Sequence, residues 1–295
     1  MEFSHLTALA AVVDEGTFDA AARRLHVTPS AVSQRIKALE TSVGQVLVTR
    51  SKPVRPTPGG EVVLRLARQV GTLTTDALAE IGAGGDGTGG DGTSTVVPIA
   101  ANADSLATWL VPALAGARPG VVLDVHRDDQ ERTADLLRRG TVMAAVTSEP
   151  DAVPGCTVRR LGRMRYHAAA HPEFVRRWFP GGVDPDRLVV APIVAYDRAD
   201  QLQERYLRRR MRRRSPAPRH YLPDTTAFVQ AVALGMGWGM LLDEQIDALP
   251  APRPRRLDPG RTVDVVLYWQ QWRLRSPALD AVTDAVRKAA RHRLD

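Results

Sequence analysis

A single cysteine, Cys156, stands in this sequence of 295 residues. One cysteine excludes an internal disulfide framework and a cysteine-based zinc site, so we expect no metal ion. No apolar run approaches the roughly 18 to 20 residues that a membrane-spanning helix needs. The first residues, Met1-Glu2-Phe3-Ser4-His5, hold no basic stretch followed by an apolar one, so no export signal is visible. These absences predict a soluble cytoplasmic protein with no cofactor and no membrane partner.

What is present is the composition of a globular protein. Hydrophobic residues make up 44% and charged residues 25%, which argues against a disordered chain. The length suffices for two or three small domains. The formal net charge of +7 permits a nucleic-acid partner but does not establish one. Residues 1–82 carry a net charge of +1 and the remainder +6, so charge alone does not locate such a partner.

Glycine is concentrated in one stretch, residues 82–94, where seven of the thirteen residues are glycine and none is large and apolar. Such a stretch has nothing to bury and is typical of a flexible linker. A phosphate-binding loop would need a preceding strand and a following Lys-Ser/Thr at a helix start, and neither is there. The pattern therefore predicts a hinge at residues 83–94.

The segment before the hinge is helical by its apolar spacing. The pattern predicts helices over residues 3–16, 18–25 and 29–43, with Thr17 and Thr28 as N-caps and Gly44 as the last stop. A β-prone stretch at 46–48 and three prolines follow. A longer helix then runs from about residue 57 to 81. Its apolar residues recur at near-heptad spacing and predict a dimerisation seam: Val62, Val63, Leu66, Val70, Leu73, Ala77, Leu78 and Ile81.

The segment after the hinge alternates strands and helices. Its first part predicts strands at 95–100, 121–126 and 142–146, joined by helices at 106–114 and 130–139. This βαβαβ order implies a parallel sheet covered by helices. Further strands are expected at 164–170, 189–195, 237–242 and 263–269, and further helices at 199–213, 228–234 and 277–291. We interpret the whole as two α/β lobes.

The third helix carries an outward polar face opposite an apolar inner one. Ser30, Ser33, Gln34 and Lys37 recur at i, i+3, i+4 and i+7, with Arg35 at their flank. A helix that enters the DNA major groove presents such short polar groups and glutamine to base edges, and its N-terminus can hold a phosphate. Basic residues in the proline-rich hairpin would contact the flanking backbone. The predicted DNA-binding residues are Thr28, Ser30, Ser33, Gln34, Arg35, Lys37, Arg50, Lys52 and Arg55.

Periodicity alone fits an ordinary helical hairpin with a solvated polar face equally well. The order of the elements favours the DNA reader, because a short helix, a turn, a polar helix, a basic hairpin and a dimer helix follow one another.

Several motifs along this segment are specific. They are Gly16-Thr17-Phe18, Ala21-Ala22-Arg23-Arg24-Leu25, Thr28-Pro29-Ser30-Ala31-Val32-Ser33, Ile36-Lys37-Ala38-Leu39-Glu40 and Thr57-Pro58-Gly59-Gly60. With these motifs, residues 3–60 resemble the winged helix-turn-helix domain of LysR-type transcriptional regulators. The family's usual aromatic residue in the wing is replaced by Val46-Leu47-Val48. The resemblance implies an α+β winged domain with a long dimerisation helix, followed by a two-lobed, periplasmic-binding-protein-like α/β effector module.

A second set of motifs resembles one branch of that family, the lysine- and arginine-responsive regulators of basic amino acid export. The motifs are Asn102-Ala103-Asp104-Ser105-Leu106-Ala107-Thr108-Trp109, Leu137-Arg138-Arg139-Gly140, Phe179-Pro180-Gly181-Gly182-Val183 and Ala227-Phe228-Val229-Gln230. The resemblance implies a homodimer or homotetramer on promoter DNA that recruits RNA polymerase. The resemblance also implies that the effector is lysine, arginine or histidine. The sequence leaves open which of the three it is.

Polar residues that follow the predicted strands or begin helices are candidates for the effector site, because ligands of such modules bind there. Hydroxyls and free amides suit an α-carboxylate, and carboxylates suit a cationic side chain. The predicted effector-binding residues are Asn102, Asp104, Ser105, Asp128, Asp129, Thr147, Ser148, Glu149, Asp224 and Thr225. Asp197 is a further candidate. Each acid is equally well explained as a helix cap or a solvated loop residue.

The expected domains follow from these elements. They are the winged helix-turn-helix at 1–58, the dimerisation helix at 59–82, the hinge at 83–94, lobe I at 95–168 and 270–295, and lobe II at 169–269.

Three other functions have some support. Ser105, His126 and His167 raise the possibility of a hydrolase, but no Gly-X-Ser-X-Gly elbow occurs, so we expect no enzyme. A two-lobed solute-binding protein would share the architecture without a DNA role. A regulator of this family responding to another metabolite is the third alternative.

Eight arginines crowd residues 205–219, which favours a solvated helix face over a DNA or subunit contact.

Overall fold

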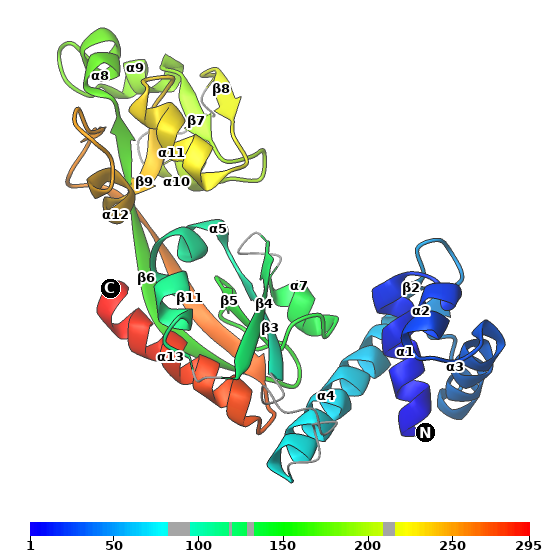
Figure 1. Cartoon of the computed structure of the whole chain (residues 1–295). Coiled ribbons are helices and arrows are strands. Elements are labelled where there is room, and N and C mark those ends of the chain that lie inside the picture. Colours follow the sequence, from blue (N-terminus) through cyan, green and yellow to red (C-terminus); the bar gives the residue numbers. More distant parts are fainter. Residues whose placement is uncertain (82–94, 118–119, 129–132, 209–215) are drawn as a thin grey trace. The chain divides into compact units, whose positions relative to one another are not determined.

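The computed structural model describes residues 1–81, 95–117, 120–128, 133–208 and 216–295 (Figure 1). The predicted hinge, the candidate Asp129 and residues 209–215 of the arginine-rich stretch lie outside the described residues. Within the described part, no helix is long and apolar enough to cross a membrane. The chain divides into two compact units. The first comprises Met1–Asn102, Gly116–Arg159 and Trp269–Ala285, and the second comprises Ala103–Ala115, Arg160–Tyr268 and Val286–Asp295.

Three short helices open the first unit, within one residue of the predicted bounds. They are α1 (Phe3–Glu15), α2 (Phe18–Arg24) and α3 (Pro29–Val43). Thr17 Oγ1 accepts a hydrogen bond from Ala20 N and Thr28 Oγ1 accepts one from Ala31 N, each at 3.2 Å, so both N-caps are confirmed. Gly44 ends α3 in the left-handed conformation, with φ at 74°.

The apolar face of α3 is what orients its polar face. Val32, Ile36 and Leu39 are buried in a core that also holds Leu9 of α1 and Ala21 of α2. Because these residues recur at three- and four-residue spacing, burying them turns the opposite side of α3 to solvent. The predicted inward and outward faces of this helix are confirmed.

A two-stranded wing follows α3, formed by β1 (Val48–Thr49) and β2 (Arg55–Pro56), which pair antiparallel. Two hydrogen bonds hold it against the helices. Leu47 N donates to Glu40 Oε1 at 2.9 Å, and Val54 N donates to Gly16 O at 2.8 Å. The wing is therefore fixed at both ends to the helical core.

The long helix α4 (Pro58–Glu80) starts against the wing. Thr57 Oγ1 donates to Val46 O at 2.7 Å and accepts from Gly60 N at 3.0 Å. The backbone comes so close here that a Cβ built on Gly60 would lie 1.9 Å from the Leu47 carbonyl oxygen. Glycine at this position is required by that close approach.

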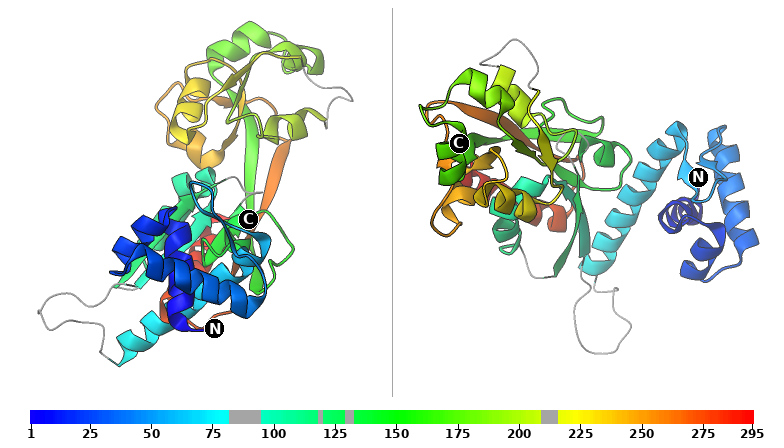
Figure 2. Two further views of the ribbon diagram at one scale, coloured as in Figure 1. Left: turned by 90° about the vertical axis from the view of Figure 1, so that its right-hand side faces the viewer. Right: turned by 90° about the horizontal axis from the view of Figure 1, so that it is seen from above.

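The apolar residues of α4 divide between two faces. Val63, Leu64 and Ala67 are buried against the helical core, and α4 extends beyond that core in both views of Figure 2. Val62 and Leu66, which share another face, are 56% and 40% exposed. The near-heptad stripe of the sequence therefore combines residues of the domain's own core with an exposed strip.

The remainder of the first unit is built on parallel strands. β3 (Thr95–Ala101) pairs in parallel with β4 (Val121–Arg127) and with β5 (Ala144–Thr147), which confirms the predicted βαβαβ order. α7 (Thr133–Arg138) lies between β4 and β5 in the chain. Gln270 Nε2 donates to Glu149 O at 3.0 Å and thereby fixes the loop after β5.

The second unit contains shorter strands and most of the remaining helices. β6 (Cys156–Ala170) and β11 (Thr262–Trp272) contribute residues to both units. Within the second unit, β9 (Gly239–Leu242) and β10 (Arg255–Arg256) pair antiparallel with β6, and β7 (Ile193–Ala195) pairs in parallel with β8 (Arg219–Tyr221). The helices are α5 (Ala103–Ser105), the π-helical turn η1 (Leu106–Leu110), α6 (Val111–Leu114), α8 (Pro172–Trp178), α9 (Pro185–Val190), α10 (Leu202–Arg208), α11 (Thr225–Ala233), α12 (Asp243–Asp247) and α13 (Pro277–Arg293), of which α13 spans both units.

Some expected bounds differ from the structure. The strand expected at 189–195 is wrong at its start, because residues 189 and 190 end α9 and the strand begins at Ile193. Asp184 caps α9 through its hydrogen bond from Asp186 N at 2.8 Å, and Pro185 follows at the first helical position. This local helix start decides the structure, although the β-branched Val189 and Val190 favour a strand. The helix expected at 106–114 begins three residues earlier, and the strand expected at 164–170 begins at Cys156.

The two units do not correspond to the two expected lobes, because the first unit also contains the N-terminal helices and the wing. The expected lobes, residues 95–168 with 270–295 and residues 169–269, therefore stay a prediction.

Gly60→Ala tests the close approach of α4 to the wing. We expect the added methyl group to lower the free energy of unfolding by about 1 to 3 kcal/mol, because backbone must shift to accommodate it. Gly71→Ala in the same helix is the matched control, since a Cβ there meets nothing within 4 Å. It should raise stability by at most about 1 kcal/mol. Denaturant unfolding measures both, and a Gly60→Ala variant as stable as wild type would contradict the packing.

Candidate functional site

The outward face of α3 is polar and largely exposed. Ser30, Gln34 and Lys37 are exposed, while Ser33 and Arg35 are partly buried. Thr28, which precedes the helix, has its hydroxyl oxygen 3.0 Å from Ser30 Oγ and also caps the helix. No carboxylate of the described residues pairs with Lys37 or Arg35. The face can therefore offer its donors and acceptors to a partner.

The wing adds three exposed cations beside this helix, Arg50, Lys52 and Arg55. The Arg50 guanidinium carbon lies 6.0 Å from the centroid of the Phe18 ring. Of the two acids that flank the wing in sequence, Glu40 accepts a hydrogen bond from Leu47 N and Glu61 pairs with Arg139. In the described part of the chain none of the three cations has an ion-pair partner. The helix and the wing each carry exposed side chains of the kinds that bind phosphates and base edges.

Five of the predicted effector residues belong to the first unit, where three parallel strands end. Asn102 follows β3, Asp128 follows β4 and Thr147 ends β5, and parallel strands place these ends along one edge of the sheet. Asp128 N donates to Ala101 O at 3.3 Å, which brings Asp128 beside the end of β3. The other two residues, Ser148 and Glu149, lie in the following turn, where Thr147 Oγ1 accepts from the backbone N–H of Glu149 at 3.1 Å.

Four predicted effector residues belong to the second unit. Asp224 caps α11 by accepting from Ala227 N at 2.8 Å, and Thr225 begins that helix. Ser105 is buried, with its hydroxyl 3.6 Å from the Met164 sulfur. The fourth, Asp104, has the most developed environment of the set.

Asp104 lies at the centre of a hydrogen-bond network. Tyr166 OH donates to its Oδ2 at 2.8 Å, and Gln245 Nε2 donates to its Oδ1 at 3.1 Å. Burial raises the pKa of this carboxyl above its usual value, and the negative charge of Asp200 adds to the effect, while the two hydrogen bonds oppose it. The carboxyl of Asp104 therefore holds its proton to a higher pH than an exposed aspartate does.

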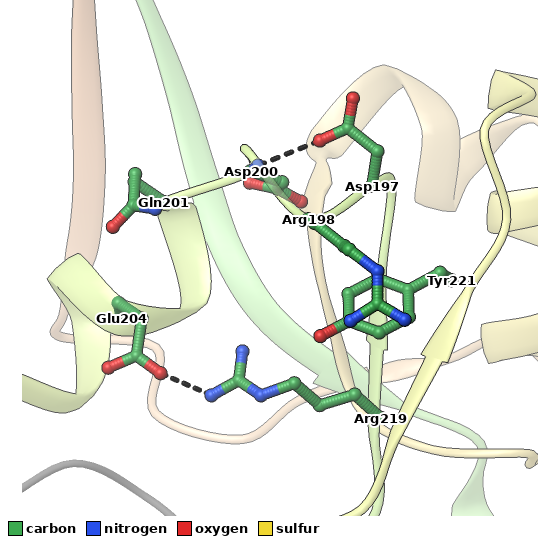
Figure 3. A pocket seen from close by; sticks show the side chains of 7 residues that line it. All are labelled: Asp197, Arg198, Asp200, Gln201, Glu204, Arg219 and Tyr221. Carbon is green, nitrogen blue, oxygen red and sulfur yellow. Dashed lines mark hydrogen bonds and ion pairs between the residues drawn. The ribbon is translucent and has the colours of Figure 1, made fainter.

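A pocket lies in the same unit, with a volume of about 290 Å³ (Figure 3), and Asp200, whose charge acts on Asp104, is one of the residues that line it. It is bounded by the loop after β7, by α10 and by β8. Its lining residues are Asp197, Arg198, Asp200, Gln201, Glu204, Arg219 and Tyr221. Arg219 pairs with Glu204, and the Arg198 guanidinium carbon lies 4.9 Å from the centroid of the Tyr221 ring.

Of these lining residues the sequence pointed only to Asp197. The same rule that selected the other candidates, polar residues directly after a strand, applies to Arg198, Asp200 and Gln201 as well. Arg219 and Tyr221 lie on β8, a strand that the sequence patterns did not reveal. Tyr166 and Gln245 were missed because nothing in their local sequence marks them as partners of Asp104.

The residues that suggested a hydrolase have other contacts. His126 Nε2 lies 3.1 Å from Asp124 Oδ2, and His167 Nε2 lies 3.3 Å from Asp243 Oδ1. Burial lowers the pKa of His167, opposed by Asp243. Among the described residues, no group of three or more histidine, cysteine, aspartate or glutamate side chains is placed to hold a metal ion.

Two protein-family models match the chain. Residues 3–61 match the description "Bacterial regulatory helix-turn-helix protein, lysR family", and residues 90–291 match "LysR substrate binding domain".

Curated relatives match almost the whole chain. A protein named HTH-type transcriptional regulator LysG from Mycobacterium tuberculosis is 47% identical over 292 residues, covering 97% of this chain and 92% of the relative. The lysine export transcriptional regulatory protein LysG of Corynebacterium efficiens is 41% identical over 295 residues, covering 97% of both. Among solved structures, full-length LysG of Corynebacterium glutamicum with bound effector arginine is 35% identical. Its TM-score is 0.82, and the match covers 100% of this chain and 99% of that one.

Asp104→Asn tests the environment of the buried carboxyl. Because the folded-state pKa is raised, the group stabilises the fold below its unfolded-state pKa, and this contribution is lost as the pH rises through the folded-state pKa. We therefore expect Asp104→Asn to gain stability relative to wild type at neutral pH, and the gain to shrink as the pH is lowered. Denaturant unfolding at a series of pH values measures it.

Tyr166→Phe is the companion variant, since it removes a hydrogen bond that lowers the pKa of Asp104 while keeping the ring. The pH at which stability changes should move upward. A difference between Asp104→Asn and wild type that is independent of pH would contradict this account of the carboxyl.

Proposed function

Because the chain belongs to the LysR family of bacterial transcriptional regulators, we propose that its effector is a basic amino acid and its target a gene for amino acid export. The regulator predicted from the sequence is confirmed, since a helix-turn-helix model and a substrate-binding model together span most of the chain. A solute-binding protein without a DNA role is thereby excluded. The relatives are regulators rather than enzymes.

The likeness to an arginine-bound regulator is the observation that supports a basic effector most directly. That likeness extends over the whole chain and includes both the DNA-binding and the effector-binding parts. A relative named for lysine export supports the proposed target. We infer that lysine, arginine or histidine binds the effector module and changes how the protein acts at a promoter.

The DNA-reading role falls to α3 and the wing. Gln34 and the serines of α3 are exposed and suited to hydrogen bonds with base edges. Lys37 and the three wing cations suit phosphates, because each neutralised phosphate releases counterions and raises affinity for any sequence. Thr28 and Arg35 complete the predicted set at the ends and flank of the helix.

The effector contacts proposed for the two units have different chemistry. Asp128 and Glu149 in the first unit supply carboxylates for a cationic group, beside Asn102, Thr147 and Ser148. In the second unit, Asp104, Ser105, Asp224 and Thr225 remain our proposed set, to which the pocket residues are added. The carboxylates offset the cost of removing a charged side chain from water.

We propose that the protein acts in the cytoplasm as a homodimer or homotetramer. The exposed face of α4, with Val62, Leu66 and Leu73, gives a second copy an apolar strip to cover. Recruitment of RNA polymerase is the proposed means by which promoter binding changes transcription.

Gln34→Ala and Arg55→Ala separate base reading from phosphate binding. We expect Gln34→Ala to reduce discrimination between cognate and scrambled DNA by about 1 to 3 kcal/mol. Arg55→Ala should weaken binding to both and lower the slope of log affinity against log salt by about 0.9. Fluorescence anisotropy over a salt series measures each quantity.

Arg24→Ala is the matched control for the DNA experiment, because this exposed arginine already pairs with Asp14 and Glu15. It should leave DNA affinity nearly unchanged. Equal losses on cognate and scrambled DNA for Gln34→Ala would remove that residue from base reading. A wild-type protein without salt-dependent promoter binding would overturn the DNA role itself.

Asp128→Asn tests the carboxylate proposed for the ligand cation. In a thermal-shift screen of the twenty amino acids on the full chain, lysine, arginine or histidine should raise the melting temperature of wild type by mass action. Asp128→Asn should lower the affinity for the amino acid that stabilises wild type roughly tenfold, which is the lower end of the range for a hydrogen bond to a charged group. Asp124→Asn, in the strand β4 that Asp128 follows, is the control. Stabilisation by other amino acids but none of these three would refute the proposed effector class.

A further inference from the structure

The pocket of the second unit holds two arginines whose surroundings differ. Arg219 is committed to Glu204, and both side chains are 18% exposed. Arg198 is exposed, and no described carboxylate pairs with it. Figure 3 shows its guanidinium over the face of the Tyr221 ring, with 4.9 Å from the guanidinium carbon to the ring centroid. Within the described residues, Arg198 is therefore a cation of the pocket without an ion-pair partner.

The acids of the same loop are occupied by its backbone. Asp197 Oδ1 accepts from Ala199 N at 2.7 Å and from Asp200 N at 2.9 Å. Asp200 Oδ2 accepts from Tyr196 N at 3.0 Å, and its Oδ1 accepts from Leu202 N at 3.0 Å. These four hydrogen bonds fix the backbone on both sides of Arg198. The backbone of Arg198 is thus held by the loop, and its guanidinium packs on the Tyr221 ring.

A guanidinium that stacks on a ring keeps its N–H groups free, because they point outward in the plane of the group. That planar fork matches a carboxylate, which can accept two parallel hydrogen bonds from it. The stacking also reduces the freedom that Arg198 would lose on binding. The arrangement is suited to an anionic group of a small ligand.

We propose that Arg198 binds the α-carboxylate of the effector, with Tyr221 as the residue that positions it. This assignment rests on the proposed function, in which the effector is an amino acid. Arg219 is paired with Glu204, and the carboxylates of Asp197 and Asp200 accept hydrogen bonds from the loop backbone. Arg198 is therefore the charged side chain of the pocket that is left to meet the carboxylate of the ligand.

The experiment compares arginine with argininamide, in which a neutral amide replaces the carboxylate. Isothermal titration calorimetry on the full chain gives the affinity ratio of the two ligands for each variant. Wild type should bind arginine roughly tenfold or more tightly than argininamide, as expected when a charged hydrogen-bond partner is lost. In Arg198→Ala, arginine affinity should fall and the ratio should approach one. A ratio that stays at the wild-type value would overturn the assignment.

Two further variants sharpen the outcome. Arg177→Ala is the matched control, since Arg177 also lies over a ring in the same unit, 6.0 Å from the centroid of Trp178. It should leave the ratio unchanged, and an equal fall in both arginine variants would mean a long-range effect of charge that contradicts a direct contact. Tyr221→Leu should lower the ratio by less than Arg198→Ala, because the guanidinium remains but is no longer held. An unchanged ratio in Tyr221→Leu would remove its positioning role.

Failure of the proposed function gives a different result. If wild type binds another amino acid and no basic one, the effector class is wrong, and the same ratio for that amino acid and its amide tests Arg198. If wild type binds no amino acid of the twenty, the proposed function and the assignment of Arg198 both fall.

Discussion

The approach of α4 to the wing at Gly60 is the constraint on which the N-terminal half depends. The Leu47 carbonyl leaves no room for a side chain there, so the first turn of α4 packs directly against the backbone that leads into the wing. Thr57 and Glu40 hold the two sides of the same junction through their hydrogen bonds. The wing, the exposed face of α3 and the exposed strip of α4 are thereby fixed relative to one another within this domain.

Much of the DNA-reading half was predictable because its signals are local. A threonine cap, a proline at the first helical position and a glycine at the end define α3 within 17 residues, and the apolar spacing fixes which face is outward. The wing was harder to predict, since strands of two residues are stabilised by contacts to Gly16 and Glu40 rather than by their own sequence.

The effector half was predictable in its alternation but much less so in its site. Asp104 is joined to Gln245 across 141 positions of sequence, and no pattern near either residue announces the pair. Arg198 and Tyr221 come together because β7 and β8 pair in parallel, and β8 has only three residues. The strand start expected at residue 189 is wrong because of a local signal: Asp184 and Pro185 start α9, and its β-branched valines lie within the helix.

The division of the chain between the two units limits whether either unit can be produced separately from the other. The path crosses from one unit to the other at five points, so neither unit is encoded by a continuous stretch of sequence. A protease that cuts once within residues 160–268 leaves both fragments carrying parts of both units. A gene fragment that ends there likewise leaves strands without their neighbours. Neither unit can therefore be produced from one continuous segment of the chain.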